Sequence, residues 1–149
     1  MTNVLRPSCL VLLAAFAACG SKDSPEHQVR QAIERVELAA EARDVGDVMK
    51  NISDHYSDAS DMTREDAARY LRGYFIANQS IHLLTRIEQV EFPATDEARA
   101  NVLVGMVGRE AAASSRWDLA ADLYEFDVTL RREDGDWKVT YARWQQRGR

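Results

Sequence analysis

Two stretches of the chain hold residue types that can exchange protons. The segment Asp54–Asp58 places His55 and Tyr56 between acidic side chains, and an imidazole beside carboxyl groups can act as an acid or a base near neutral pH. Later in the chain, Asp122 shares strand parity with Tyr124, which directs it toward an apolar interior where an acid can serve as a general base. Both groups also have a plainer interpretation. Asp54–Asp58 could be an exposed connection in which Tyr56 packs into the core, and Asp122 could lie beyond the rim of the cone, hydrogen-bonded to arginine or water.

Exposed aromatic side chains are a second kind of candidate, because exposed tryptophan favours the binding of a partner or ligand. Trp117 and Trp144 are expected at the surface, Trp144 because its parity opposes that of the tryptophan that begins the last strand. Tyr124 is a third candidate binding residue. Binding through the sheet predicts an apolar patch on its convex face, where Trp144 joins Leu103 or Val107.

No metal or cofactor is expected. No cluster of His, Cys, Asp and Glu has the spacing of a metal site, and the sequence contains no glycine-rich phosphate loop and no nucleophile motif. The 149 residues include 24 acidic and 19 basic side chains, a formal net charge of −5. This acidic balance argues against nucleic acid as a partner. The length suits one domain with its own core.

The N-terminus has the composition of a secretory signal. Arg6 precedes the apolar run Leu10–Ala18, and no acidic residue occurs before Asp23. A basic start, an apolar run and small residues are typical of an exported leader. The run is shorter than the roughly 20 residues that a membrane-spanning helix needs. Cys9 would leave with the leader, so Cys19 would have no disulfide partner.

The end of this leader, Phe16-Ala17-Ala18-Cys19-Gly20, resembles the lipobox of bacterial lipoproteins, with Phe16 where leucine is usual. The resemblance implies a signal peptide of residues 1–18 and a lipid on Cys19 that ties the protein to a membrane. Within residues 19–24, the lipidated cysteine and its tether, the segment Gly20–Ser24 would reach less than about 20 Å. Gly20, where aspartate would imply the inner membrane, implies the periplasmic side of the outer membrane. The alternative is an ordinary cleaved signal with a chance cysteine.

Helix signals come first in the remaining domain, residues 25–149. Ser24 and Pro25 form a helix start, and Thr63 with Asp66 resembles a capping box. The expected helices span residues 26–43, 45–52 and 63–78.

Alternating apolar residues predict strands in the second half of the domain. The apolar parity switches between Ile87 and Val90, which predicts a β-bulge near Glu88 and Gln89. The segment Glu133–Asp136 predicts a hairpin turn with a glycine at positive φ. The expected strands span residues 81–92, 98–106, 116–132 and 137–146.

Three helices packed on a curved four-stranded antiparallel meander make an α+β fold. The element order, the bulged first long strand and the ending Asp134–Tyr141 resemble the nuclear transport factor 2-like superfamily over residues 25–146. Polyketide-cyclase-like (SnoaL-like) and ketosteroid-isomerase-like proteins belong to it. The resemblance implies a cone-shaped barrel, often with a cavity, and frequent homodimers through the outer sheet face. The isomerases' tyrosine on the first helix is absent here, so their catalytic site is not transferred.

The sequence therefore favours a membrane-anchored periplasmic lipoprotein with a non-enzymatic binding or assembly role. The ligand would be a small apolar molecule in the cone, or a protein partner on the sheet face. The alternative is a cone-cavity isomerase, dehydratase or cyclase that uses Asp122 with His55 or a tyrosine such as Tyr56. An enzyme needs at least two convergent polar groups that face a cavity, which separates the two hypotheses.

Overall fold

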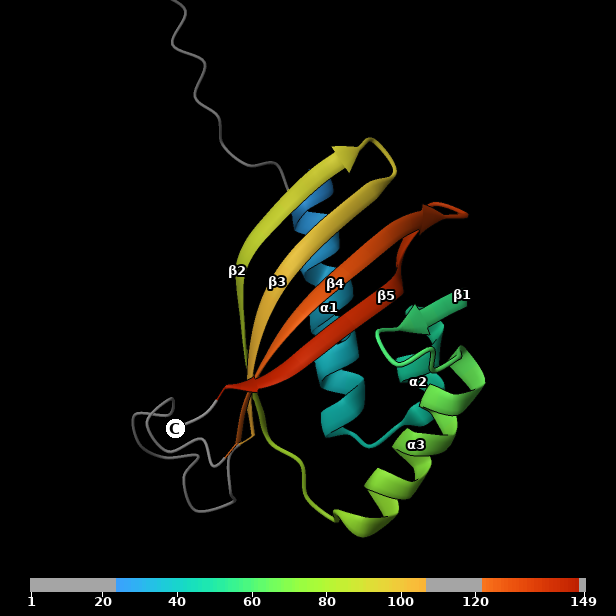
Figure 1. Ribbon diagram of the computed structural model, residues 1–149, viewed down its shortest axis with the longest axis vertical. Helices are drawn as coiled ribbons and strands as arrows, with labels where there is room; N and C mark the ends of the chain where they lie inside the picture. Colours follow the sequence, from blue (N-terminus) through green and yellow to red (C-terminus); the bar gives the residue numbers. More distant parts are fainter. Residues whose placement is uncertain (1–23, 107–121, 148–149) are drawn as a thin grey trace, which may run out of the picture.

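Helices cover one side of a curved sheet (Figure 1) in the computed structural model, which describes residues 24–106 and 122–147. The elements are α1 (Pro25–Glu41), α2 (Val45–Lys50), β1 (Ile52–Asp58), α3 (Arg64–Ala77), β2 (Leu83–Ala94), β3 (Glu97–Met106), β4 (Asp122–Glu133) and β5 (Asp136–Arg147). The strand order is β1-β5-β4-β3-β2, with β1 parallel to β5 and the other neighbours antiparallel. None of the helices in these two ranges has the length and apolar character to cross a bilayer.

Two helices begin where their capping residues predict. The Ser24 hydroxyl accepts a hydrogen bond from the His27 amide at 3.2 Å, ahead of Pro25 in the first turn of α1. At the start of α3, the Thr63 hydroxyl accepts from the Asp66 amide while the Asp66 carboxylate accepts from the Thr63 amide. The capping box predicted from the sequence is confirmed.

The predicted bulge in the first long strand is also confirmed. The pairing of β2 with β3 shifts after Ile87 and leaves Glu88 as the extra residue. Ile87 and Val90 consequently both pack against the core despite their opposite parity. In the β4–β5 turn, Asp134 and Gly135 have φ values of 51° and 93°, the positive angles that a two-residue hairpin needs.

A fifth strand corrects the sequence prediction of four antiparallel strands. The pattern places Ile52 in a helix and Asp54–Asp58 in a connection, whereas the structure forms β1 over these residues. α2 ends at Lys50 because Asn51 leaves helical geometry, and its carbonyl accepts a hydrogen bond from the Val139 amide at 2.9 Å. Pairing with a strand at the far end of the chain overrides the local pattern.

A second bulge corrects the predicted direction of Trp144. The pairing of β4 with β5 shifts beside Leu130, which leaves Thr140 as an extra residue in β5. Trp144 therefore lies on the same side of the sheet as Trp137 and stacks on Phe126, with ring centroids 5.9 Å apart. We call the side of the sheet toward α1 the inner face and the opposite side the outer face.

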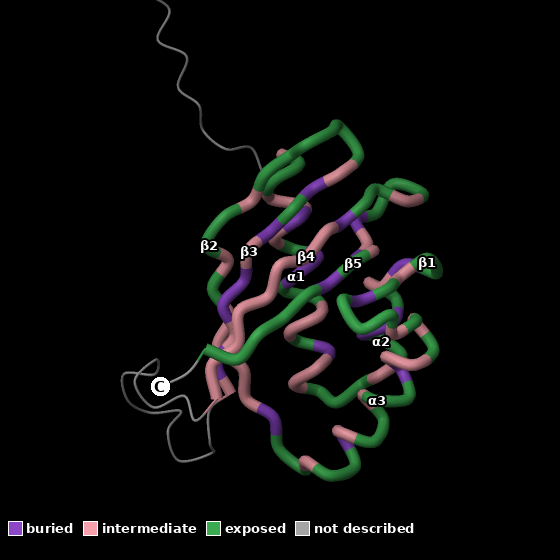
Figure 2. The backbone as a smooth tube through the Cα atoms, viewed as in Figure 1, coloured by how far each residue is buried: buried purple, intermediate pink, exposed green. Residues whose placement is uncertain are grey.

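The core lies between the inner face and the helices, where Val29 of α1 and Leu130 of β4 are fully buried. Figure 2 shows buried residues along β3 and in the middle of the sheet, with exposed residues along β2 and on the outer sides of the helices. The α+β architecture expected from the sequence is confirmed, with one strand more than predicted.

Candidate functional site

Aromatic side chains gather on the inner face of β4 and β5, and α3 contributes one more ring through its contact with the end of β3. We call Tyr74, Tyr124, Phe126 and Trp144 the aromatic rim. Tyr124 lies next to Phe126 with ring centroids 6.5 Å apart, and Phe126 stacks on Trp144. Tyr74 reaches over from α3 and donates its hydroxyl to the Met106 sulfur at 3.1 Å. Trp144 is 41% exposed and the other three are partly buried, so ring surface remains accessible to a ligand.

Asp122 supplies a carboxylate to the aromatic rim. It points inward, as its shared parity with Tyr124 predicts, and its Oδ1 accepts a hydrogen bond from Gln146 Nε2 at 2.9 Å. The pKa of the Tyr74 hydroxyl is raised, first by burial and then by the neighbouring Tyr70, Tyr124 and Asp122. Asp122 is thus one of the groups that act on the Tyr74 hydroxyl.

The structure does not bring His55 to Asp122. β1 pairs with β5 near Tyr141, whereas Asp122 lies just beyond the partner of Arg147. About six strand residues at roughly 3.3 Å each separate these two levels by about 20 Å. His55 is exposed, and Tyr56 lies at the same distant level of β1. The catalytic pairing of Asp122 with either residue is therefore not assembled.

A buried acid that the sequence analysis did not single out as a site lies at the end of β1. Asp58 is 3% exposed, and its Oδ1 accepts hydrogen bonds from the amides of Ser60 and Met62 at 2.7 and 2.8 Å. Within the described part of the chain its Oδ2 has no hydrogen-bond partner. Burial, Asp58 and Tyr141 raise the pKa of Tyr56 to about 12. The Ser and Asp residues that follow Asp58 are the sequence signal for this turn.

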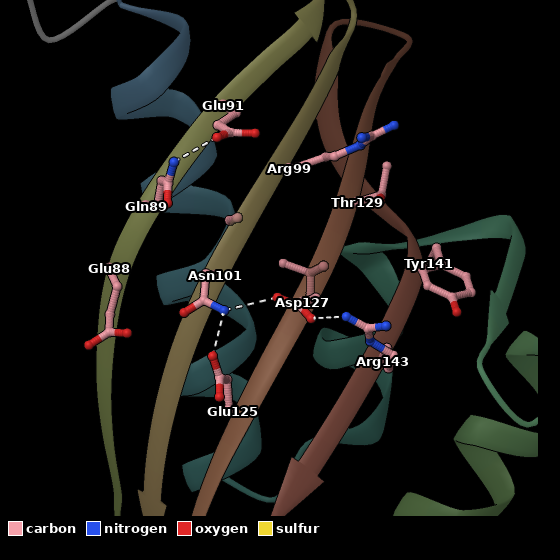
Figure 3. A pocket seen from close by; sticks show the side chains of 12 residues that line it. Glu88, Gln89, Glu91, Arg99, Asn101, Glu125, Asp127, Thr129, Tyr141 and Arg143 are labelled. Atoms are coloured by element: carbon pink, nitrogen blue, oxygen red, sulfur yellow. Dashed lines mark hydrogen bonds and ion pairs between the residues drawn. The ribbon is translucent and has the colours of Figure 1, made fainter.

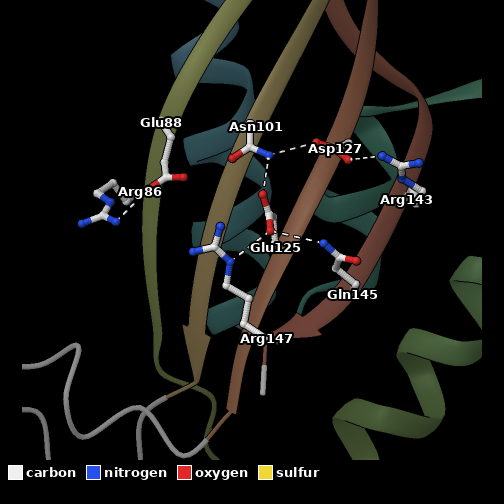
Figure 4. Close-up of polar contacts among 8 residues, drawn as sticks. All are labelled: Arg86, Glu88, Asn101, Glu125, Asp127, Arg143, Gln145 and Arg147. Carbon is white, nitrogen blue, oxygen red and sulfur yellow. Dashed lines mark hydrogen bonds and ion pairs between the residues drawn. The ribbon is translucent and has the colours of Figure 1, made fainter. Parts of the chain in front are cut away.

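The outer face carries a network of polar side chains centred on Asn101 (Figure 4), which we call the outer network. Asn101 Nδ2 donates to Glu125 Oε1 at 3.1 Å and to Asp127 Oδ1 at 2.9 Å. Arg147 pairs with Glu125 at 3.0 Å, and Arg143 pairs with Asp127 at 2.6 Å. These contacts lower the pKa of both carboxyls, with the Asn101 hydrogen bond the largest cause at Glu125 and the Arg143 hydrogen bond the largest at Asp127.

The outer network borders an open groove of about 610 Å³ (Figure 3) whose walls include Glu88, Glu91 and Tyr141. Charged and amide side chains dominate the groove. The sequence predicts an exposed apolar patch on this face, but Leu103 is only 4% exposed and Trp144 lies on the inner face. The predicted patch is therefore wrong for these two residues.

Several predicted features lie outside the described residues: Cys19 with its leader, Val107, Trp117 and the first part, residues 116–121, of the strand expected over 116–132. The predictions that rest on them stay predictions. Within residues 24–106 and 122–147, no three His, Cys, Asp or Glu side chains gather in a way that could hold a metal ion.

No family model matches this sequence, and no curated protein matches it. Solved structures do resemble it. A nuclear transport factor 2-like protein of unknown function from Pseudomonas putida superposes with a TM-score of 0.61 at 18% identity, over 80% of this chain and 84% of that one. A domain of unknown function with a cystatin-like fold from Nostoc punctiforme gives 0.68 at 12% identity, over 83% and 78%.

A ketosteroid isomerase-like protein from Erwinia carotovora atroseptica also superposes, with a TM-score of 0.61 at 12% identity, over 83% of this chain and 96% of that one. Identities this low establish a shared fold and no shared activity. The chain therefore has the α+β fold of nuclear transport factor 2-like and cystatin-like proteins.

Proposed function

We propose that this protein is a lipid-anchored periplasmic binding protein whose aromatic rim holds a small apolar ligand. The observation that carries the proposal is the stack of Phe126 and Trp144, which leaves ring surface exposed on the inner face. Covering such surface is worth about 25 cal/mol per Å² of apolar area, and stacking on an aromatic ligand adds to it. A ligand would therefore bind over the ring surface of Phe126 and Trp144 that the fold leaves exposed.

The outer face supports the same choice by contrast. Glu125 and Asp127 already accept hydrogen bonds from Asn101 and from two arginines. A partner that docks there must desolvate or replace contacts that are already made, so the net gain is small. This favours ligand binding on the inner face over a protein partner or a second copy on the outer face.

The direction of α1 fits a lipid anchor on Cys19. Near its start, Gln28 accepts a hydrogen bond from the Trp137 indole at 3.3 Å, beside the β4–β5 turn. At its other end, Glu41 accepts from the Leu83 amide at 2.8 Å, where β2 begins. The helix thus runs between opposite ends of the sheet.

The aromatic rim lies at the far end from the proposed anchor. Met106 pairs with Leu83 on one side and with Asp122 on the other, so all three belong to the end where α1 finishes. The 17 residues of α1 span about 25 Å at 1.5 Å per residue. A lipid on Cys19 would hold the rim away from the membrane, open to ligands dissolved in the periplasm.

Binding of a neutral apolar fluorophore, 6-propionyl-2-(dimethylamino)naphthalene, tests the proposal on the full chain carrying Cys19→Ser. Trp144→Ala should weaken binding by at least about tenfold, because it removes the most exposed ring of the rim. Tyr141→Ala is the matched control, since Tyr141 is 38% exposed but lies on the outer face. The proposal would be overturned if the two substitutions had equal effects, or if the chain with Cys19→Ser alone did not bind the fluorophore.

The proposed anchor has its own test in cells labelled with palmitate. Cys19→Ser should abolish labelling, and Cys9→Ser should leave it intact because Cys9 belongs to the leader. Labelling that survives Cys19→Ser excludes Cys19 as the anchor.

A further inference from the structure

The negative charge of the Asp122 carboxylate, beside the aromatic rim, would favour some apolar ligands over others. We infer that the ligand of the rim is an organic cation, an amine or quaternary ammonium on an apolar body, held with the positive charge between Asp122 and the rim's rings. This inference rests on the proposed function, because it names the class of ligand that the same site takes.

Among residues 24–106 and 122–147, no cationic side chain forms an ion pair with Asp122. The partner of its Oδ1 is the neutral amide of Gln146. The arginines of the adjoining strand are engaged elsewhere: Arg143 and Arg147 contact Asp127 and Glu125 on the outer face. Side chains alternate along β4 and β5, so the Asp122 carboxylate lies on the inner face while Arg143 and Arg147 lie on the outer face.

Further acids lie at the same end of the inner face. Glu41 accepts the Leu83 amide, and Leu83, Met106 and Asp122 follow one another across neighbouring strands. Two strand spacings of about 4.8 Å place the Leu83 and Asp122 backbones about 10 Å apart. Glu37 lies one turn before Glu41 and belongs to the same end of α1. A cation that enters here meets carboxyl groups from both α1 and β4.

The rings supply the second half of the attraction. A cation over the face of Trp, Tyr or Phe is drawn to the negative face of the ring, and the attraction is larger when the cation can give up its water at little cost. Organic cations meet this condition better than metal ions, whose hydration is far stronger. Tyr124 is the next inward residue of β4 after Asp122, and the rings of Phe126 and Trp144 continue the row from there. Carboxylate and aromatic groups together favour an organic cation over a neutral molecule of the same shape.

Two probes of nearly identical shape isolate the charge: choline, and 3,3-dimethylbutan-1-ol, in which carbon replaces the charged nitrogen. The measurement is an NMR titration that follows the indole N–H of Trp144, identified by its loss in Trp144→Phe. We expect choline to bind at least about tenfold more tightly than the alcohol. Asp122→Asn should remove this preference. Asp127→Asn removes one charge from the outer face of the same strand and should preserve it.

Gln146→Lys is a second variant, since it sets a positive charge against Asp122 without altering the carboxylate, and it should also abolish the preference. The dispersion of the NMR spectrum shows whether Asp122→Asn is folded. If it is not, Gln146→Lys still tests the inference. Equal midpoints for choline and the alcohol, or a preference that survives both substitutions, would overturn the inference.

The same titration separates this inference from the proposed function. Equal binding of both probes refutes the organic cation and leaves apolar binding intact. If neither probe moves the Trp144 signal while the neutral fluorophore binds, the cation is again refuted alone. If neither the probes nor the fluorophore binds, the inference and the proposed function both fail.

Discussion

The inner and outer faces of β4 are built from alternating residues of one strand. The outer face has paired polar groups, whereas the inner face has aromatic rings that are partly exposed to water. Asp127 faces outward and is paired with Asn101 and Arg143. Phe126, its neighbour, faces inward and stacks on a tryptophan that is 41% exposed. A surface whose polar groups are matched by the protein has little to gain from a ligand, whereas exposed rings beside a carboxylate still do.

The two faces should also contribute unequally to the stability of the fold. Apolar burial is worth up to about 3 kcal/mol for a single large side chain, while exposed ion pairs contribute about 1 kcal/mol or less. The inner face should therefore carry most of the folding free energy and the outer network only a minor part. Substitutions on the two faces test this division.

The largest effect should come from Leu130→Ala. Leu130 is fully buried on the inner face, so its truncation removes apolar contacts and leaves a cavity, at a cost of about 2–5 kcal/mol. Urea unfolding followed by circular dichroism measures the loss. Thr129→Ala is the control, because Thr129 precedes Leu130 but lines the outer groove. Similar losses for both substitutions would contradict the division between the faces.

The next effect appears at high pH and belongs to Tyr56. Burial above all raises its pKa to about 12, from an ordinary value of 10.0. A raised pKa contributes stability that is complete below the unfolded value and is lost as the pH rises through the folded value, so unfolding should set in between about pH 10 and 12. Absorbance at 295 nm should show a late titration step near pH 12 that belongs to Tyr56.

Tyr56→Phe should remove that late step, while Tyr141→Phe, on the outer face, should leave it in place. If the late step disappears in Tyr141→Phe instead, the late-titrating hydroxyl is that of Tyr141 and the prediction for Tyr56 is wrong.

Local patterns predicted the elements whose signals lie within a few residues of one another. Thr63 and Asp66 cap α3 as their spacing indicates, and the bulge at Glu88 follows from a parity switch that apolar residues make visible. The bulge at Thr140 has the same kind of switch, but it is hidden because Tyr141 continues the earlier apolar parity. Tyr141 lies on the outer face, and its aromatic character misled the prediction for Trp144.

β1 could not be predicted for a different reason. Its seven residues, ISDHYSD, are mostly polar, and its two apolar side chains, Ile52 and Tyr56, are four apart, which is also a helical spacing. The strand exists because β5 pairs with it, and that partner lies at the end of the chain. At the candidate site, strand parity correctly predicted that Asp122 points to the inner face. The sequence pattern does not give the distance between Asp122 and His55.

A smaller effect tests the helix that contributes to the aromatic rim. Thr63→Ala removes one half of the capping box of α3 and should cost about 1 kcal/mol. Thr63→Ser keeps the accepting hydroxyl and should restore most of the loss. Because α3 carries Tyr74, NMR shifts should change in the rim and not at Asn101 on the outer face. Shifts of equal size on both faces would show that the helix and the outer network are coupled.

The smallest effect should be the acid response of the outer network. The folded pKa values of Glu125 and Asp127 lie below their ordinary values of 4.5 and 3.8. A lowered pKa contributes stability that is present above the unfolded value and is lost as the pH falls through the folded value. Asn101→Ala removes the largest cause of the lowering at Glu125. It should reduce stability slightly at pH 7 and leave less to lose in acid, so that the urea midpoints of variant and wild type converge toward about pH 2.

Gln89→Ala is the control for this acid response, because Gln89 is an outer-face amide that contacts Glu91 instead of the two network carboxylates. Its midpoints should keep the wild-type dependence on pH. If Asn101→Ala and the wild type differ by a constant amount from pH 7 down to about pH 2, then Asn101 stabilises the sheet through packing alone. The lowered pKa values would then owe nothing to the amide, and the outer face would resemble the inner face more closely than its charges suggest.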